Sequence, residues 1–240
     1  MTESSEQNVK IQRLGERTIL YDATLLENPN ATLFAPVNTT ATAPGRGAAI
    51  FYQHAGLDLV LKHYHRGGMV AALMGDHYLG YAAENTRSFR EWCLLKTLQR
   101  FDLPAPVPVL ASFNKTSLFS YRADLITRAI PNSLPLADYL FTRPLSAERW
   151  QQLGQVLARF HEKNVYHADL NARNILLDEK QFYLIDFDKG RVRVMSEGWK
   201  SLNLVRLQRS LNKFRAAYPE MNYSAENWQQ LLAGYKNLKN

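Results

Sequence analysis

Cysteine is almost absent from this sequence. Cys93 is the only one in 240 residues, so no disulfide bond can form within the chain. Such usage is typical of proteins in a reducing compartment. Long apolar runs are also missing, since no segment approaches the ~20 residues that a helix needs to cross a bilayer. The first residues are polar and lack the basic and apolar parts of a secretory signal. We therefore expect a cytoplasmic protein, with any membrane contact confined to its surface.

Acidic residues are fewer than basic ones. The chain has 22 Asp and Glu against 29 Lys and Arg, which gives a net charge of +7. Such a surface favours an anionic partner, for example a nucleotide, a nucleic acid, an acidic lipid or an acidic sugar. No recognised nucleic-acid-binding motif occurs, so we do not expect a nucleic-acid partner. The hydrophobic content of 46% allows a sizeable core.

The pattern of apolar residues changes near the middle of the chain. The first half is mostly predicted strand, at residues 10–14, 18–21, 48–53, 57–64 and 118–128. One helix is predicted there, at 86–100, where apolar residues recur every three positions from Phe89 to Leu98. The second half is mostly predicted helix, at 134–140, from the N-cap Ser146 to Phe160, at 200–217 and at 224–238. Two short strands, 174–177 and 182–185, interrupt these helices.

The most informative segment is residues 167–177, which read His-Ala-Asp-Leu-Asn-Ala-Arg-Asn-Ile-Leu-Leu. A His-x-Asp followed by Asn five residues after the Asp is typical of a kinase catalytic loop. Asp169 is therefore the candidate catalytic base, which would accept or orient the proton of an attacking hydroxyl. The alternative is an Asp that only caps a helix or a turn. His167 is expected to pack structurally rather than act as a base.

Asn174 and Asp186 are the candidate magnesium ligands. Hard cations prefer oxygen ligands, and Mg²⁺ is usually held by one or two protein oxygens together with phosphates. A turn Asn and a strand-ending Asp are the alternatives. Asp186-Phe187-Asp188 carries Asp where the usual motif has Gly. That departure removes a hinge and argues against a switchable activation loop. The expected cofactors are ATP and Mg²⁺.

Lys62 ends the strand-like run Leu-Val-Leu-Lys and is the candidate contact to the α- and β-phosphates of ATP. The alternative is an outward-facing surface lysine. Glu91 is the candidate carboxylate that pairs with Lys62, with Glu84 as its rival. Because Ser88-Phe-Arg-Glu91 also matches a capping box, Glu91 could instead serve only the start of the helix.

Two glycines, Gly45 and Gly47, form a candidate phosphate-cradling turn before the strand at 48–53. The third glycine of the usual kinase loop is missing, since Ile50 stands there, and a plain flexible loop is the alternative. Asn171 occupies the place where a protein kinase has Lys, and Arg173 could supply the missing positive charge. Together these features predict an α+β, protein-kinase-like domain with two lobes: a strand-rich N-lobe, 1–128, and a helical C-lobe, 129–240.

Several of these segments together resemble the lipopolysaccharide-core kinases of Gram-negative bacteria. The likeness covers roughly residues 40–215. It is carried by 45–47 (Gly-Arg-Gly), 62–68 (Lys-His-Tyr-His-Arg-Gly-Gly), 86–89 (Thr-Arg-Ser-Phe), 167–177 and 184–190 (Leu-Ile-Asp-Phe-Asp-Lys-Gly). The resemblance implies ATP-dependent phosphorylation of the 4-hydroxyl of 3-deoxy-D-manno-octulosonic acid (Kdo) on a lipid A precursor. It also implies a peripheral enzyme at the cytoplasmic face of the inner membrane.

The residues themselves point to a similar acceptor class. Only 52 residues follow Asp188, and no Ala-Pro-Glu anchor occurs among them, which argues against a regulated protein kinase. A lipid-linked acidic sugar and an anionic membrane surface would explain the basic charge better than ATP alone. Arg66 and Arg87 are candidate contacts to the acceptor's acidic groups, as is Arg173. No obligate protein partner is evident. Another acceptor, such as a core heptose or an aminoglycoside, and a pseudokinase scaffold remain the alternatives.

The helix predicted at 200–217 carries basic residues at helical spacing: Arg206, Arg209 and Lys213. Leu207, Leu211 and Phe214 stand beside them. This basic amphipathic pattern could lie against anionic headgroups. It could equally belong to a solvated helix whose apolar side packs on the lobe.

Overall fold

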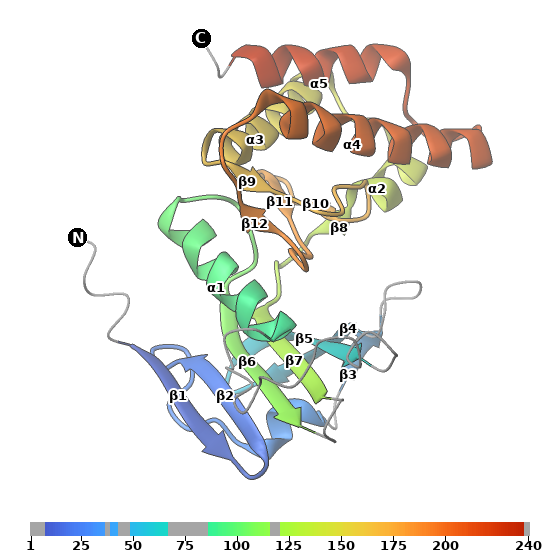
Figure 1. The fold of residues 1–240 in the computed structure, drawn as a ribbon. Coiled ribbons are helices and arrows are strands. Elements are labelled where there is room, and N and C mark those ends of the chain that lie inside the picture. The colour runs from blue at the N-terminus through green and yellow to red at the C-terminus, as the bar shows by residue number, and fades with distance from the viewer. Residues whose placement is uncertain (1–7, 37–38, 43–48, 67–85, 116–120, 238–240) are drawn as a thin grey trace. The chain divides into compact units, whose positions relative to one another are not determined.

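The computed structural model describes residues 8–36, 39–42, 49–66, 86–115 and 121–237 (Figure 1). The chain divides into two compact units. The first comprises Met1–Lys96 and Val107–Ala129, and the second comprises Thr97–Pro106 and Ile130–Asn240. Each unit has its own sheet and its own set of buried side chains, so each is described separately.

The first unit is built on a seven-stranded antiparallel sheet in the order β1-β2-β6-β7-β5-β4-β3. The strands are β1 (Val9–Leu14), β2 (Arg17–Asp22), β3 (Thr39–Thr42), β4 (Ala49–His54), β5 (Leu57–Arg66), β6 (Pro108–Lys115) and β7 (Tyr121–Arg128). A tight turn joins β4 to β5, the two strands predicted at 48–53 and 57–64. Ala55 and Gly56 both have positive φ, 49° and 76°, as two-residue hairpin turns require.

The two faces of this sheet have different contacts because side chains alternate along each strand. On one face, Leu59 and Leu61 of β5 are fully buried with Ile126 of β7. They share a core with Leu33 and Phe34 of the short 3₁₀ helix η1 (Ala31–Phe34). The other face of β5, with Lys62 and Tyr64, contacts helix α1.

A charged cluster lies on the same face of the sheet as Leu59 and Leu61. Asp124 of β7 is 3% exposed. Its carboxylate lies 2.7 Å from His63 Nδ1, forms an ion pair with Arg17 and accepts a 3.0 Å hydrogen bond from Ser112 Oγ. Burial alone would raise the pKa of Asp124, but the hydrogen bond with His63 and the charge of Arg17 hold that pKa below its ordinary value.

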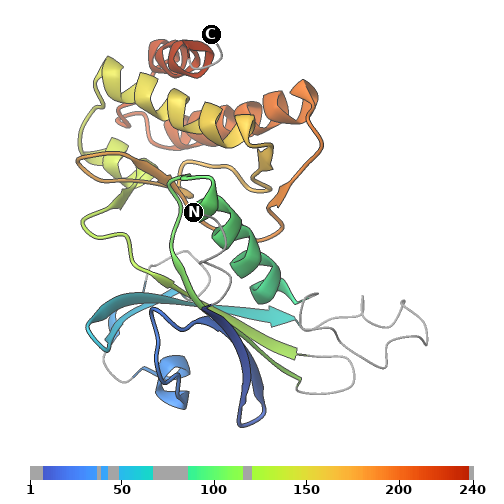
Figure 2. The same cartoon turned by 90° about the vertical axis from the view of Figure 1, so that its left-hand side faces the viewer.

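Helix α1 (Arg87–Arg100) begins in the first unit and lies against the sheet (Figures 1 and 2). The predicted apolar face is confirmed, because Phe89, Trp92, Leu95 and Leu98 are each 3% exposed or less. The Phe89 ring meets Phe113 of β6 edge to face, with ring centroids 5.6 Å apart. Because the apolar face of α1 packs on the sheet, the Glu91 side chain is held next to Lys62 of β5.

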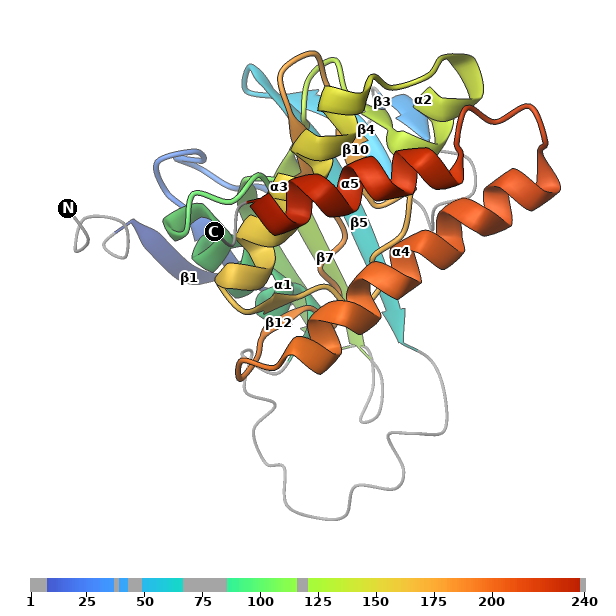
Figure 3. The ribbon, with the colours of Figure 1, turned by 90° about the horizontal axis from the view of Figure 1, so that it is seen from above.

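The second unit is mainly helical. Its helices are α2 (Leu136–Thr142), α3 (Ala147–Glu162), α4 (Glu197–Ala217) and α5 (Ala225–Asn237). The predicted N-cap is confirmed, since Ser146 Oγ accepts a hydrogen bond from the backbone N–H of Arg149. The helices α3 and α5 cross in close contact (Figure 3). A Cβ on Gly154 would stand 2.0 Å from the Leu231 carbonyl oxygen, so this crossing requires glycine.

Short strands frame the loops of the second unit. A three-stranded sheet has the order β11-β10-β8, with β8 (Leu134–Pro135), β10 (Ile175–Leu177) and β11 (Phe182–Leu184). A second ladder pairs β9 (Val165–Tyr166) with β12 (Arg191–Val192). The sequence predicted β10 and β11 but not β8, β9 or β12. Strands of two residues are too short for an alternating pattern to reveal them.

Candidate functional site

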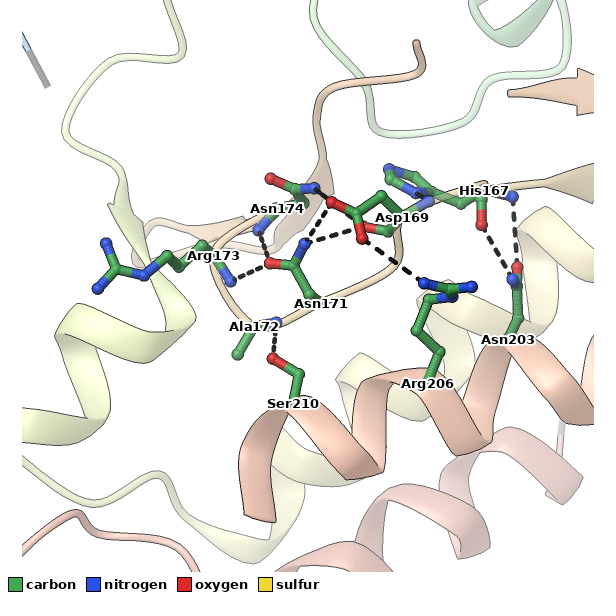
Figure 4. A network of polar contacts seen from close by, with 9 residues as sticks. All are labelled: His167, Asp169, Asn171, Ala172, Arg173, Asn174, Asn203, Arg206 and Ser210. Carbon is green, nitrogen blue, oxygen red and sulfur yellow. Dashed lines mark hydrogen bonds and ion pairs between the residues drawn. The ribbon is translucent and has the colours of Figure 1, made fainter. Parts of the chain in front are cut away.

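Asp169 lies in the loop between β9 and β10, and its side chain is 63% exposed (Figure 4). Two asparagine side chains hold it. Asn171 Nδ2 donates to the Asp169 carbonyl oxygen and to Oδ2, both at 3.0 Å. Asn174 Nδ2 donates to the same two atoms, at 2.9 and 3.4 Å. The carboxylate is therefore positioned through Oδ2, which leaves Oδ1 directed elsewhere.

Asn171 also folds the loop back on itself. Its Oδ1 accepts hydrogen bonds from the backbone N–H of Arg173 at 2.8 Å and of Asn174 at 3.2 Å. Asn171 thus makes both the turn and a contact to the carboxylate. Sequence reasoning noted this residue only as the absence of a lysine. The tendency of Asn to hydrogen-bond to the backbone two residues ahead was the available signal.

His167 is a structural residue, as predicted. It is 2% exposed, and its Nδ1 accepts a hydrogen bond from the Asp169 backbone N–H at 3.2 Å. Its Nε2 lies 2.9 Å from the Ile185 carbonyl oxygen. An Nδ1 that accepts and an Nε2 that donates require the neutral tautomer with the proton on Nε2. The ring therefore joins the loop that carries Asp169 to the segment that carries Asp186.

The two predicted metal ligands lie at the same end of the β10–β11 hairpin. The Ile185 N–H donates to the Asn174 carbonyl oxygen at 3.0 Å, which extends the ladder one step beyond Ile175 and Leu184. Asn174 uses its amide nitrogen on Asp169, so its side-chain oxygen can face a cation. Asp186 has φ of +63°. An amide oxygen and a carboxylate suit Mg²⁺, which also takes water and phosphate oxygens. Among the residues that the structure describes, no three or more His, Cys, Asp or Glu side chains form a metal-binding group.

The segment after Asp186 is short and held in place. Phe187 is 1% exposed, and its ring stacks on Phe160 with centroids 5.9 Å apart. The Gly190 N–H donates to the Phe187 carbonyl oxygen at 2.7 Å, and β12 begins at the next residue. Asp188 lies within this turn, and the absence of a switchable loop stays a prediction.

Lys62 and Glu91 form the predicted ion pair in the first unit. Lys62 Nζ lies 3.2 Å from Glu91 Oε2, and their side chains are 25% and 4% exposed. The Tyr64 hydroxyl also contacts the Glu91 carboxylate. The capping-box alternative is not what the structure shows, because the Ser88 hydroxyl donates instead to the Ser112 carbonyl oxygen at 2.8 Å. The ATP contact proposed for Lys62 stays a prediction.

The structure places only some of the predicted anion-binding residues. Arg87 stacks over the Tyr64 ring, 4.9 Å from its centroid, beside the Lys62–Glu91 pair. Arg66 ends β5, but its side chain is outside what the structure describes. Gly45, Gly47 and Glu84 also lie outside the described residues. Their roles therefore stay predictions.

Among the residues that the structure describes, a cation of helix α4 lies beside Asp169, and sequence reasoning did not connect the two. Arg206 Nη1, on α4, lies 3.8 Å from Asp169 Oδ1 (Figure 4). The guanidinium of Arg173 lies over the Phe214 ring, 5.3 Å from its centroid. The only earlier signal for Arg206 was its place in the basic pattern of that helix.

Comparison with known protein families gives a match over most of the chain. The model of the "Lipopolysaccharide kinase (Kdo/WaaP) family" matches residues 36–235. A 3-deoxy-D-manno-octulosonic acid kinase from Vibrio vulnificus (strain YJ016) is 36% identical over 236 residues, which cover 95% of this chain and 99% of the relative. The enzyme of the same name from Actinobacillus succinogenes is 39% identical over 205 residues, which cover 82% and 85%.

Two solved structures have a similar fold. WaaP in complex with acyl carrier protein has a TM-score of 0.56 at 13% identity, over 89% of this chain and 85% of that one. A glucosamine kinase has a TM-score of 0.54 at 12% identity, over 95% and 81%. The predicted α+β, protein-kinase-like fold is therefore confirmed.

Proposed function

This chain belongs to the lipopolysaccharide kinase (Kdo/WaaP) family, and we propose that it transfers the γ-phosphoryl group of ATP to the 4-hydroxyl of Kdo in a Kdo-lipid A precursor. Relatives at 36–40% identity carry the name 3-deoxy-D-manno-octulosonic acid kinase. The observation that carries the chemistry is the geometry of Asp169. Its carboxylate is exposed and is held at one oxygen by two amide groups.

Asp169 acts as the base in this proposal. The acceptor hydroxyl oxygen forms a bond to the γ-phosphorus, and the bond from that phosphorus to the bridging oxygen of ADP breaks. The hydroxyl proton passes to Asp169, whose Oδ1 is the oxygen not engaged by the two asparagine amides. General-base help of this kind contributes ~10²–10⁴-fold. Asn171 and Asn174 keep the carboxylate oriented, which lowers the entropic cost of reaching the reactive geometry.

The phosphate-binding roles follow from charge and donor type. Asn174 and Asp186 would hold Mg²⁺, which neutralises phosphate charge when it is bound. Lys62 would contact the α- and β-phosphates, with Glu91 holding its ammonium group in place. The backbone around Gly45 and Gly47 would complete the phosphate contacts.

The proposed acceptor is an anionic lipid, and the proposed location is the cytoplasmic face of the inner membrane. A Kdo-lipid A precursor carries a carboxylate and phosphates, which matches the net charge of +7. No helix within the described ranges is long and apolar enough to cross a membrane.

Mass spectrometry tests the proposal directly. The Kdo-lipid A precursor is incubated with the protein, ATP and MgCl₂, and a gain of one phosphate on the Kdo fragment is expected. The Asp169→Asn protein serves as the control for contaminating kinases. A precursor that gains no mass, or gains it on the lipid A sugars, would refute the assignment. Parallel reactions with a heptose acceptor and an aminoglycoside test the two alternative acceptors.

A further inference from the structure

Helix α4 has one buried face, and that face packs inside the second unit. Trp199, Asn203, Leu207 and Leu211 are 6% exposed or less. Of the two interpretations of this helix, packing of Leu207 and Leu211 on the lobe is therefore confirmed. These leucines are not the ones that could meet a lipid.

A second set of aliphatic side chains lies on the outward face of α4. Leu202 is 67% exposed and Val205 is 46% exposed. Arg206, Arg209 and Lys213 are exposed as well. The five residues are spaced i, i+3, i+4, i+7 and i+11, so they share one side of the helix. They are called the α4 stripe below.

The α4 stripe is anchored next to the catalytic carboxylate (Figure 4). Asn203 Nδ2 donates to the His167 carbonyl oxygen at 2.9 Å. The Ser210 hydroxyl accepts from the Ala172 N–H at 3.2 Å, and Arg206 reaches Asp169 from the stripe itself. These contacts join both ends of the catalytic loop to α4. The position of the stripe relative to Asp169 is therefore fixed within the second unit.

The composition of the α4 stripe favours one kind of partner. Helix α4 carries five basic residues and one acid, Glu197, which pairs with Lys200 at 3.2 Å. Just before the helix, Val194 and Met195 are 89% and 72% exposed. Cations alone would suit any polyanion, but exposed aliphatic side chains gain nothing from a phosphate backbone. Aliphatic residues alternating with cations fit the boundary between acyl chains and anionic headgroups.

We infer that the α4 stripe is the surface on which this protein lies against an anionic lipid layer, with Arg206 meeting the acidic group that the lipid presents next to Asp169. This inference rests on the proposed function only in taking the acceptor to be lipid-linked. Leu202 and Val205 enter the headgroup boundary, and Arg209 and Lys213 lie on phosphates. The catalytic loop then faces the lipid layer from which the acceptor projects.

Vesicle flotation tests the stripe without the kinase reaction. The probe is vesicles of neutral phosphatidylcholine with 30 mol% of phosphatidylglycerol, compared with phosphatidylcholine alone. The double variants Leu202→Ser/Val205→Ser and Arg209→Gln/Lys213→Gln are the tests. Since each cation near such a surface is worth about fivefold in affinity, the charge variant should bind about 30-fold more weakly. The affinity of the aliphatic variant for the vesicles should fall by about tenfold or more.

Matched controls come from exposed residues elsewhere. Ile11→Ser removes an aliphatic side chain that is 65% exposed on β1, and Lys180→Gln removes an exposed cation in the β10–β11 turn. Ile11→Ser should bind vesicles like the wild type. Lys180→Gln should lose less vesicle affinity than either stripe variant. Each protein is first checked by thermal unfolding, which should stay near the wild-type midpoint because the changed side chains are exposed.

Kinase assays separate this inference from the proposed function. With the Kdo-lipid A precursor in vesicles, the stripe variants should lose more activity than with the same precursor in detergent micelles. If no format yields phosphorylated Kdo, the proposed function fails while the flotation result still stands. Equal vesicle binding by the stripe variants and the wild type would overturn the inference that the α4 stripe meets lipid. So would self-association of the wild type that the stripe variants abolish, since the occupant would then be a second copy.

Discussion

Each unit presents an ion pair that includes a predicted site residue, and the two pairs differ in burial. In the first unit, Lys62 and Glu91 are 3.2 Å apart, and the carboxylate is 4% exposed. In the second, Arg206 and Asp169 are 3.8 Å apart, and both side chains are more than half exposed. A buried pair is costly to break, because the remaining charge stays without compensation. An exposed pair is worth ~0–1 kcal/mol.

This difference suits the two tasks proposed for these residues. A cation that must stay in one place for a phosphate group benefits from a buried partner and from the Tyr64 hydroxyl on the same carboxylate. A carboxylate that must accept a proton has to be reachable and easily released from its cation. The contrast predicts that breaking the buried Lys62–Glu91 pair will lower the stability of the fold, whereas breaking the exposed Arg206–Asp169 pair will leave stability nearly unchanged.

Asp169→Asn should have the largest effect. An amide keeps the shape of the side chain but cannot accept the hydroxyl proton, so transfer should fall by ~10²–10⁴-fold. ATP affinity, measured by calorimetry, should change little, because the phosphate contacts are assigned to other residues. The rate is measured with labelled ATP and the Kdo-lipid A precursor. Asp138→Asn, at an exposed position in α2, is the control, and a fully active Asp169→Asn protein would remove the base assignment.

Glu91→Gln should chiefly lower stability. It removes the charge opposite Lys62 and replaces one acceptor of the Tyr64 hydroxyl, so the free energy of unfolding should fall by about 1–3 kcal/mol. Urea unfolding measures this loss. Glu27→Gln changes an exposed carboxylate of the same unit and should leave the midpoint near the wild-type value. Equal midpoints for the two variants would mean that the Lys62–Glu91 pair contributes nothing to the fold.

Asp124→Asn tests buried charge on the opposite face of the same sheet. The native pKa of Asp124 lies below its unfolded value of 3.8, because the interactions with His63 and Arg17 outweigh the effect of burial. The carboxylate therefore stabilises the fold fully above about pH 3.8, and that stabilisation is lost as the pH falls through the native pKa. In urea unfolding from pH 6 to pH 3, the variant should be less stable at pH 6. It should also lose less stability than the wild type below pH 4. If the free energy of unfolding depended on pH equally in the variant and the wild type, this account would be contradicted. The exposed Asp58→Asn is the control.

Arg206→Gln should have the smallest effect on stability. The pair with Asp169 is exposed and 3.8 Å long, so the free energy of unfolding should stay within about 0.5 kcal/mol of the wild type. The same urea series measures it beside Glu91→Gln. If Arg206→Gln lowered the free energy of unfolding as much as Glu91→Gln, the two ion pairs would contribute equally to stability despite their different burial. The KM for the lipid acceptor should rise, since Arg206 is inferred to meet its acidic group.

Much of the candidate site is local in sequence and could therefore be predicted. Asp169, Asn174 and Asp186 lie within 18 residues, and one short hairpin brings them together. The fold class followed from the change from alternating to helical periodicity. By contrast, the contact of Arg206 with Asp169 spans 37 residues, and the cluster of Arg17 with Asp124 spans 107. No periodic pattern encodes contacts between such distant segments.

The sequence by itself determined the chemistry of the loop at 167–177, because an Asp, two Asn and a short hairpin leave the backbone few ways to arrange them. It also determined that 200–217 would be helical. Only the tertiary structure decided which side of α4 faces outward. Leu202 and Val205 are as aliphatic as Leu207 and Leu211, so periodicity alone offers two apolar sides. The side of α4 that becomes buried is the one that meets a complementary surface in the rest of the second unit. In this protein that side carries Leu207 and Leu211.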